Sequence, residues 1–225
     1  MFLWRPPPAT RIPGFAATAR TLLASRLKGR GAELVLHLTE QVPPRLTLVP
    51  YGRRPVALLS AWGEVAALGR VREALAGLEG SLAGWQVDEA IPVTRERTWA
   101  VGERAPGACL LTLFHKNRKL DRDAFFHEWY QHHTPLSLRV HPLWCYVRNA
   151  VAEPIVPGSP SWDGIVCESF RERRDLLQHR RLFGGPAFDS WRALPNMVRV
   201  GRHVSSFLDM RTIENYLVEE YRLAG

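Results

Sequence analysis

Residues 127 to 136 read HEWYQHHTPL and hold three histidines, a glutamate, a tryptophan and a tyrosine ahead of a proline. Residues of these types can bind a metal ion, transfer protons or simply pack. Successive residues of a helix lie about 100° apart, so the stretch can be sorted by face. His133 then lies within an aromatic stripe, and His127 points roughly the other way. The stripe consists of Phe125, Phe126, Trp129 and Tyr130.

The position of His133 along this helix suggests an acid/base role. Pro135 disfavours helical geometry at Thr134, so His133 is expected at or near the helix C-terminus. The helix dipole there favours a protonated imidazole, whereas burial opposes it. Together these effects can place the pKa of His133 near neutrality, where a histidine takes and returns protons. The alternative is a core histidine that bonds only a backbone carbonyl.

The same stretch superficially resembles the zinc motif H-E-x-x-H, but its spacing fails. His127 and His132 are five residues apart, about 140° around a helix, whereas the motif needs four. Glu128 and His132 are correctly spaced, yet two ligands do not make a zinc site. We therefore expect no metal at these residues, and no cofactor.

Other polar side chains in the second half of the chain can converge with His133. Tyr146 and Asn149 are three residues apart in a predicted strand, so they face opposite sides. His115 ends another predicted strand. Each is more often structural than functional when taken alone. We pair Tyr146 with His133, because a phenolic hydroxyl can orient or polarise a substrate oxygen.

The elements that must position these residues follow a repeated order. Residues 1–102 are predicted to form strand, helix, strand, strand, helix, strand, and residues 108–225 repeat this order at an offset of about 108 residues. We therefore expect an α+β fold of two tandem ferredoxin-like βαββαβ halves, with their sheets packed face to face as a fused dimeric α+β barrel. The expected strands are 1–4, 33–39, 56–62, 90–101, 108–114, 143–152, 164–170 and 214–223. The expected helices are 14–28, 64–82, 122–133 and 176 to about 209, the last interrupted at residues 184–186.

Composition and charge restrict the partners. The chain has 225 residues, 46 % of them hydrophobic, and a net charge of +8. The densest arginine run, between Arg171 and Arg181, is broken by acidic residues and has no interleaved aromatic rings, so we expect no nucleic acid. No apolar stretch approaches the roughly 20 residues of a membrane span. The opening MFLWRPPP does not read as a signal peptide, because prolines follow its short apolar run at once.

The cysteines indicate a reducing environment. Cys109, Cys145 and Cys167 each fall in an apolar, strand-like run. An odd number without dense spacing does not suggest a disulfide framework. We therefore expect buried, reduced thiols and a cytoplasmic protein without a membrane partner.

Several motifs of the second half resemble the EthD domain family. The resemblance consists of an aromatic helix, an H-x-P-L step, a Y-V-x-N strand and a closing LVEEY strand. These residues are Phe126, Trp129, Tyr130, His133, Pro135, Leu136, Tyr146 to Asn149 and Leu217 to Tyr221. The match covers residues 108 to 223, and the first half resembles the family only in element order. The resemblance implies a dimeric α+β barrel within a superfamily of small dehydrating and cyclising enzymes, cofactor-free monooxygenases and haem-binding proteins.

The leading hypothesis is a cofactor-free lyase or cyclase for a small apolar or aromatic carbonyl compound, in catabolism or secondary metabolism. His133 is its acid/base, and Tyr146 holds the substrate oxygen. The residues expected to line the pocket are Phe125, Phe126, Trp129, Tyr130, His115 and Asn149. The alternatives are a non-catalytic binding protein of a degradation operon and a haem-dependent oxidoreductase. Association into a homodimer stays open.

Overall fold

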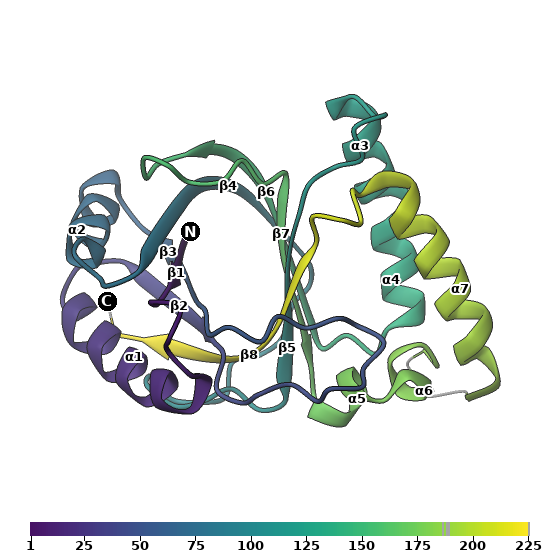
Figure 1. Cartoon of the computed structure of the whole chain (residues 1–225), viewed down its shortest axis with the longest axis horizontal. Helices are drawn as coiled ribbons and strands as arrows, with labels where there is room; N and C mark the ends of the chain where they lie inside the picture. Colours follow the sequence, from purple (N-terminus) through teal and green to yellow (C-terminus); the bar gives the residue numbers. More distant parts are fainter. Residues whose placement is uncertain (186, 188–189, 225) are drawn as a thin grey trace.

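The barrel is the central feature of the computed structural model, which describes residues 1–185, 187 and 190–224. The described strands form one closed ring in the order β1-β3-β2-β8-β5-β7-β6-β4, and every neighbouring pair is antiparallel (Figure 1). The strands are β1 (Phe2–Arg5), β2 (Glu33–Leu38), β3 (Ala57–Trp62), β4 (Ser81–Val93), β5 (Ala108–Phe114), β6 (Cys145–Pro154), β7 (Gly164–Phe170) and β8 (Glu214–Leu223).

The expectation of two ferredoxin-like βαββαβ halves, each with its own sheet, is wrong. The eight strands form one closed antiparallel barrel, because β2 pairs with β8 and β4 pairs with β6. Edge strands carry unpaired N–H and C=O groups, and closing the barrel satisfies them. Periodicity shows where strands lie along the chain, but it does not show which edges pair.

The helices cover opposite outer faces of the barrel (Figure 1). On one side, α1 (Ile12–Leu27) and α2 (Val65–Leu75) pack on the strands of the first half through Phe15, Leu23 and Val71. No helix in the described ranges is both long and apolar enough to cross a bilayer. The other side carries α3 (Arg122–His127), η1 (Glu128–His133), α4 (Thr134–Val140), α5 (Arg173–Leu177), α6 (His179–Leu182) and α7 (Ser190–Phe207).

The end of the first half differs from the expected element bounds. The helix expected over 64–82 ends at Leu75, and β4 begins at Ser81 instead of residue 90. Gly77 and Gly80 have φ of +75° and +104°, which ends the helix and turns the chain. A Cβ on Gly80 would lie 2.2 Å from the Arg5 carbonyl oxygen, so this turn requires glycine. The expected last strand, 214–223, is confirmed.

The HEWYQHHTPL stretch does not end a helix at His133, as we expected, but passes through a π-helical turn into α4. The backbone N–H of Thr134 donates to the carbonyl oxygen of Trp129, five residues earlier. Pro135 cannot donate an N–H, and its ring would clash with the carbonyl one helical turn back. The wider turn accommodates Pro135 and lets the helix continue to Val140.

This π-helical turn also changes which side chains face each other. Residues five apart lie on the same side of such a turn, so His127 and His132 do not diverge as the α-helical spacing predicted. Their Nε2 atoms are 3.2 Å apart on the exposed surface. The register argument against a metal at this pair is therefore wrong, although no group of three potential ligands forms there among the described residues.

Candidate functional site

The strands of the second half present alternate residues to two different spaces. Cys109, Leu111 and Leu113 of β5 point into the barrel, whereas Leu110, Thr112 and Phe114 point outward to the helices. Each space contains a cavity. The sequence-predicted histidine lies in the outer one.

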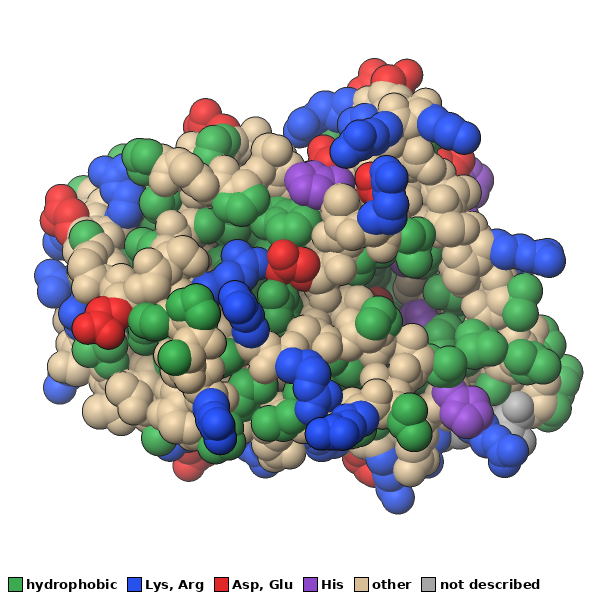
Figure 2. Space-filling model, viewed as in Figure 1, with side chains coloured by type: hydrophobic (Ala, Val, Ile, Leu, Met, Phe, Trp, Pro, Cys, Tyr) green, Lys and Arg blue, Asp and Glu red, His purple; other side chains and the backbone are tan. Residues whose placement is uncertain are grey.

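The outer cavity lies between the barrel and the helices η1, α6 and α7, and it has a volume of about 320 Å³. Hydrophobic side chains surround a hollow between the barrel and these helices on the right of Figure 2. Its size is at the lower end of the usual range for small-molecule sites, roughly 300–1,000 Å³. The polar side chains that reach this mainly apolar space are Thr112, His133, His141, Tyr146, Glu168 and Asn215.

His133 is a neutral imidazole in this cavity. Burial lowers its pKa to about 3, and the nearby His203 and His141 rings add to the effect. The expectation of a pKa near neutrality is therefore wrong, because His133 is not at a helix C-terminus and burial dominates. Nε2 lies 3.3 Å from the Ser137 hydroxyl, while Nδ1 is buried and has no hydrogen-bond partner among the described residues. Nδ1 is thus the ring atom left for a ligand.

His141 is a second neutral imidazole, and the sequence reasoning missed it. Its Nδ1 lies 2.9 Å from the Leu182 carbonyl oxygen, which accepts only from a protonated nitrogen. The proton therefore sits on Nδ1, and the lone pair is on Nε2. Burial lowers the pKa of His141 to about 4, so the ring is neutral at physiological pH and can accept a hydrogen bond.

Tyr146 and Glu168 form the polar part of the cavity's strand wall. They are direct cross-strand partners on β6 and β7, so their side chains leave the same face of the barrel. Burial raises the pKa of the Tyr146 hydroxyl well above its usual value, against the smaller, opposite effect of its contacts with the Thr134 and Trp129 side chains. Burial also raises the pKa of Glu168 to about 8. Both groups thus keep their protons at neutral pH and can donate to a ligand oxygen.

Of the other predicted site residues, Trp129 also lines the outer cavity. Phe125 packs behind it, against Phe114 and Phe207. Tyr130 lies under the Arg148 guanidinium, 4.1 Å from its ring centre, and Phe126 stacks beside Tyr130.

His115 and Asn149 lie elsewhere. His115 stacks on Trp162, with ring centres 4.6 Å apart. Asn149 points into the barrel and donates to the Ile165 carbonyl oxygen, so the expected opposite orientation of Tyr146 and Asn149 is confirmed. Neither His115 nor Asn149 lines the outer cavity with His133.

A signal for the missed residues exists in the sequence. Glu168 is the one acidic residue in the otherwise uncharged strand GIVCESF, and its position pairs with Tyr146. His141 follows α4 directly and comes before a proline. The position of His141 beside the cavity could be predicted only after α4 itself was recognised.

We expect the depressed pKa values of the two cavity histidines to make the fold sensitive to acid. The unfolded chain binds protons on these rings below about pH 6.5, whereas folded His141 does so only near pH 4. Stability is therefore lost as the pH falls from about 6.5 towards 4. In His141→Asn, which keeps a donor for Leu182 but does not titrate, unfolding free energy should fall less between pH 7 and pH 5, by on the order of 1–2 kcal/mol. Urea unfolding at both pH values measures this, and an unchanged difference contradicts it.

Comparisons with known proteins identify the fold. No family model and no curated protein matches the chain, so the resemblance to the EthD family is not confirmed. A crystal structure described as an anthrone oxidase-like protein superimposes with a TM-score of 0.56. The chain shares this protein's fold. The alignment covers 100 % of this chain and 92 % of that one at 9 % sequence identity, which supports the architecture and not a common reaction.

Proposed function

We propose that the chain is a cofactor-free lyase or cyclase that acts on a small apolar or aromatic carbonyl compound in the outer cavity. The observation that carries the proposal is the arrangement of this cavity. It brings two neutral imidazoles, His133 and His141, and the hydroxyl of Tyr146 to one mainly apolar space. Proton acceptors and a proton donor around an apolar pocket suit the removal of a proton next to a carbonyl group.

The proposed roles follow from hydrogen-bonding capacity. The His133 imidazole takes a proton from the carbon next to the carbonyl group, and His141 is the second acceptor. The Tyr146 hydroxyl donates to the carbonyl oxygen, where negative charge develops. The proton then returns to a departing hydroxyl group, which leaves as water, or to the oxygen of a ring-closure product. No electron is transferred, so the reaction needs no redox cofactor.

Three lines of argument support this choice of reaction. The resemblance of the histidine, H-x-P-L and Y-V-x-N motifs to the EthD domain favours it. The fold shared with an anthrone oxidase-like protein is consistent with a protein that handles small molecules. The cavity is lined mostly by apolar side chains, among them Trp129, Val200 and Phe207, which favours an apolar or aromatic ligand over a charged one.

A non-catalytic binding protein is the second candidate. The pKa of about 3 at His133 favours it, because a base is most efficient when its pKa lies near the working pH. A ligand that excludes water and places an acidic C–H group at Nδ1 would offset this disadvantage.

Exchange of hydrogen for deuterium separates the two candidates. Aromatic and alkyl ketones are incubated with the protein in D₂O, and mass spectrometry follows deuterium at the carbon next to the carbonyl. An enzyme that removes this proton catalyses exchange even when the later step is unknown. If the protein binds several ketones but catalyses exchange in none of them, the result supports the binding protein and contradicts the lyase.

A further inference from the structure

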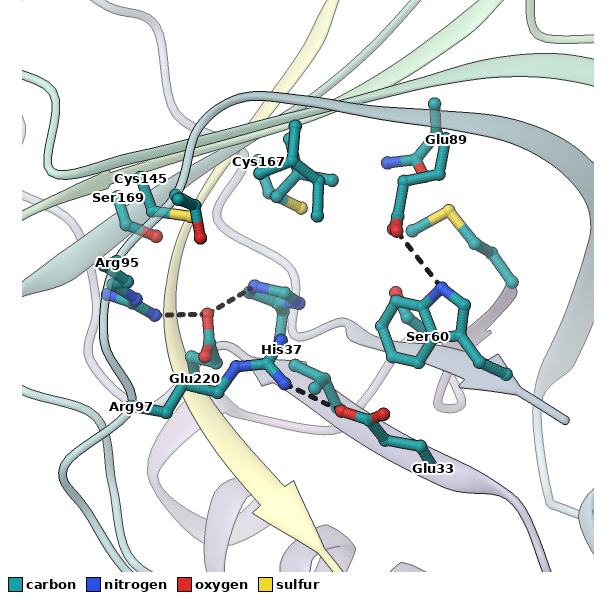
Figure 3. Close-up of a pocket in the computed structure, with 17 residues that line it drawn as sticks. Glu33, His37, Ser60, Glu89, Arg95, Arg97, Cys145, Cys167, Ser169 and Glu220 are labelled. Atoms are coloured by element: carbon teal, nitrogen blue, oxygen red, sulfur yellow. Dashed lines mark hydrogen bonds and ion pairs between the residues drawn. The ribbon is translucent and has the colours of Figure 1, made fainter.

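The barrel encloses a second cavity, of about 590 Å³, whose lining is far more polar than that of the outer one. An eight-stranded barrel is just wide enough to hold such a space. Figure 3 shows Arg95 and Glu220 side by side on its wall, with His37 next to Glu220 and Cys167 nearby. None of these side chains reaches the outer cavity.

Three soft or borderline ligand groups meet at this wall. His37 on β2, Cys109 on β5 and Cys167 on β7 each offer one ligand atom, and these atoms all lie within 4.8 Å of one another. The three residues are 5 %, 1 % and 3 % exposed. Such a cluster arises because β2, β8, β5 and β7 are consecutive in the closed barrel.

The hydrogen bonding of His37 sets it apart from an ordinary core histidine. Both ring nitrogens are buried; Nε2 meets the Glu220 carboxylate as an ion pair, whereas Nδ1 makes no hydrogen bond to another described residue. A buried polar atom without a partner is costly, so the unpaired Nδ1 calls for an explanation. A metal ion is one partner that an imidazole nitrogen and two thiols can share.

Glu220 supports the same imidazole from the next strand. Its Oε2 lies 3.3 Å from His37 Nε2, and Arg95 donates to that oxygen at 2.5 Å. Histidines that bind metals are commonly oriented by a carboxylate on their other side. The arrangement Arg95–Glu220–His37 therefore provides the outer support that such a ligand needs.

We propose that His37, Cys109 and Cys167 form a binding site for a thiophilic metal ion, with zinc(II) as the ion that they fit best. Two thiolates and one imidazole match a known zinc ligand set that leaves the fourth position open. Zinc bonds of about 2.3 Å to sulfur and about 2.0–2.1 Å to nitrogen place tetrahedral ligands about 3.5 Å apart. Since the ligand atoms all lie within 4.8 Å of one another, the cluster needs to contract by at most roughly 1.3 Å. His37 and Cys167 already line the cavity that supplies the open position.

Binding of cobalt(II) to the full-length chain tests this proposal, because cobalt takes zinc sites and its thiolate bonds absorb strongly in the near ultraviolet. We expect one cobalt per chain, displaced by one equivalent of zinc, with thiolate-to-cobalt absorption. Cys109→Ala and Cys167→Ala should each lose this absorption. Cys145→Ala is the matched control, since Cys145 lines the same cavity but lies outside the cluster, and it should bind as the unchanged chain does.

A second measurement does not depend on the variants folding. In the unchanged chain, zinc should slow the alkylation of Cys109 and Cys167 but not of Cys145, which peptide mass spectrometry distinguishes. Glu220→Gln should weaken zinc binding about 10- to 100-fold, the usual effect of losing a carboxylate that supports a metal-bound histidine.

Two outcomes would overturn the proposal. One is the absence of stoichiometric cobalt or zinc binding together with equal alkylation in the presence and absence of zinc. The other is binding that survives Cys109→Ala but is lost in His132→Ala, because the metal would then sit at the surface pair of His127 and His132.

Discussion

Replacement of His133 by alanine is expected to lower ketone exchange and turnover by about 10²–10⁴-fold, the usual span for a lost acid/base group. The fold should survive, because the one hydrogen bond that the described residues make to the His133 ring is the 3.3 Å contact to Ser137, and the other losses are the ring contacts with His203 and Phe207. The exchange rate in D₂O measures the loss. Added imidazole should restore part of it, since alanine leaves a ring-sized space beside the cavity.

Two controls belong with this substitution. His127→Ala removes an exposed histidine that does not line the outer cavity, and we expect almost no effect on exchange. His141→Ala tests the second imidazole. If His133→Ala exchanges at the original rate while His141→Ala does not, His141 is the base. If both retain it, neither histidine transfers the proton.

Gly201→Phe is expected to close the outer cavity without damage to the fold. Gly201 lies in α7 and lines the cavity, it is exposed, and a Cβ built on it meets no atom within 4 Å. A phenyl group at this opening should occupy space that the ligand needs. If the ligand can no longer bury one of its rings in the cavity, it loses about 1.5–3 kcal/mol of binding free energy, which corresponds to about 10- to 100-fold weaker binding. Titration calorimetry with a bound ketone measures the change in Kd.

The matched control for this change is Gly14→Phe. Gly14 lies in α1, on the other side of the barrel, and its Cβ also meets nothing within 4 Å. Both substitutions replace a helical glycine, so both should leave thermal stability equal or slightly higher. Equal ligand affinity in Gly201→Phe and Gly14→Phe would mean that the ligand does not enter the outer cavity.

Periodicity placed several important elements correctly. The strand-like runs at Ala108–Phe114, Gly164–Phe170 and Glu214–Leu223 located β5, β7 and β8. The aromatic stripe of the HEWYQHHTPL stretch placed Trp129 and His133 against the barrel, and strand parity placed Tyr146 and Asn149 on opposite faces of their strand. These features depend on residues close together in the sequence, so they can be predicted from the sequence alone.

Two incorrect expectations involve contacts between distant segments, and two involve local geometry that spacing rules do not show, the π-helical turn and the glycine turn before β4. Closure of the barrel depends on the pairing of β2 with β8 and of β4 with β6, between segments far apart in the chain. The π-helical turn is one residue wider than the α-helix that a 100° spacing assumes, which misplaced His132. The low pKa of His133 results from burial, to which His203 and Phe207 of α7 contribute from 70 and 74 residues later.

The interior cluster was hidden for the same reason. The three cysteines were expected to be buried and reduced, and Cys109 and Cys167 are indeed buried free thiols. Nothing in the spacing of His37, Cys109 and Cys167 brings them together, because they come from three different strands. Only the order of strands around the closed barrel makes them neighbours.

A crystal structure of the chain with a ketone that undergoes exchange tests the central claim most directly. The account places the ketone in the outer cavity, with its carbonyl oxygen within hydrogen-bonding distance of the Tyr146 hydroxyl and the adjacent carbon facing His133. A ketone bound instead inside the barrel, against His37 and Arg95, would contradict it.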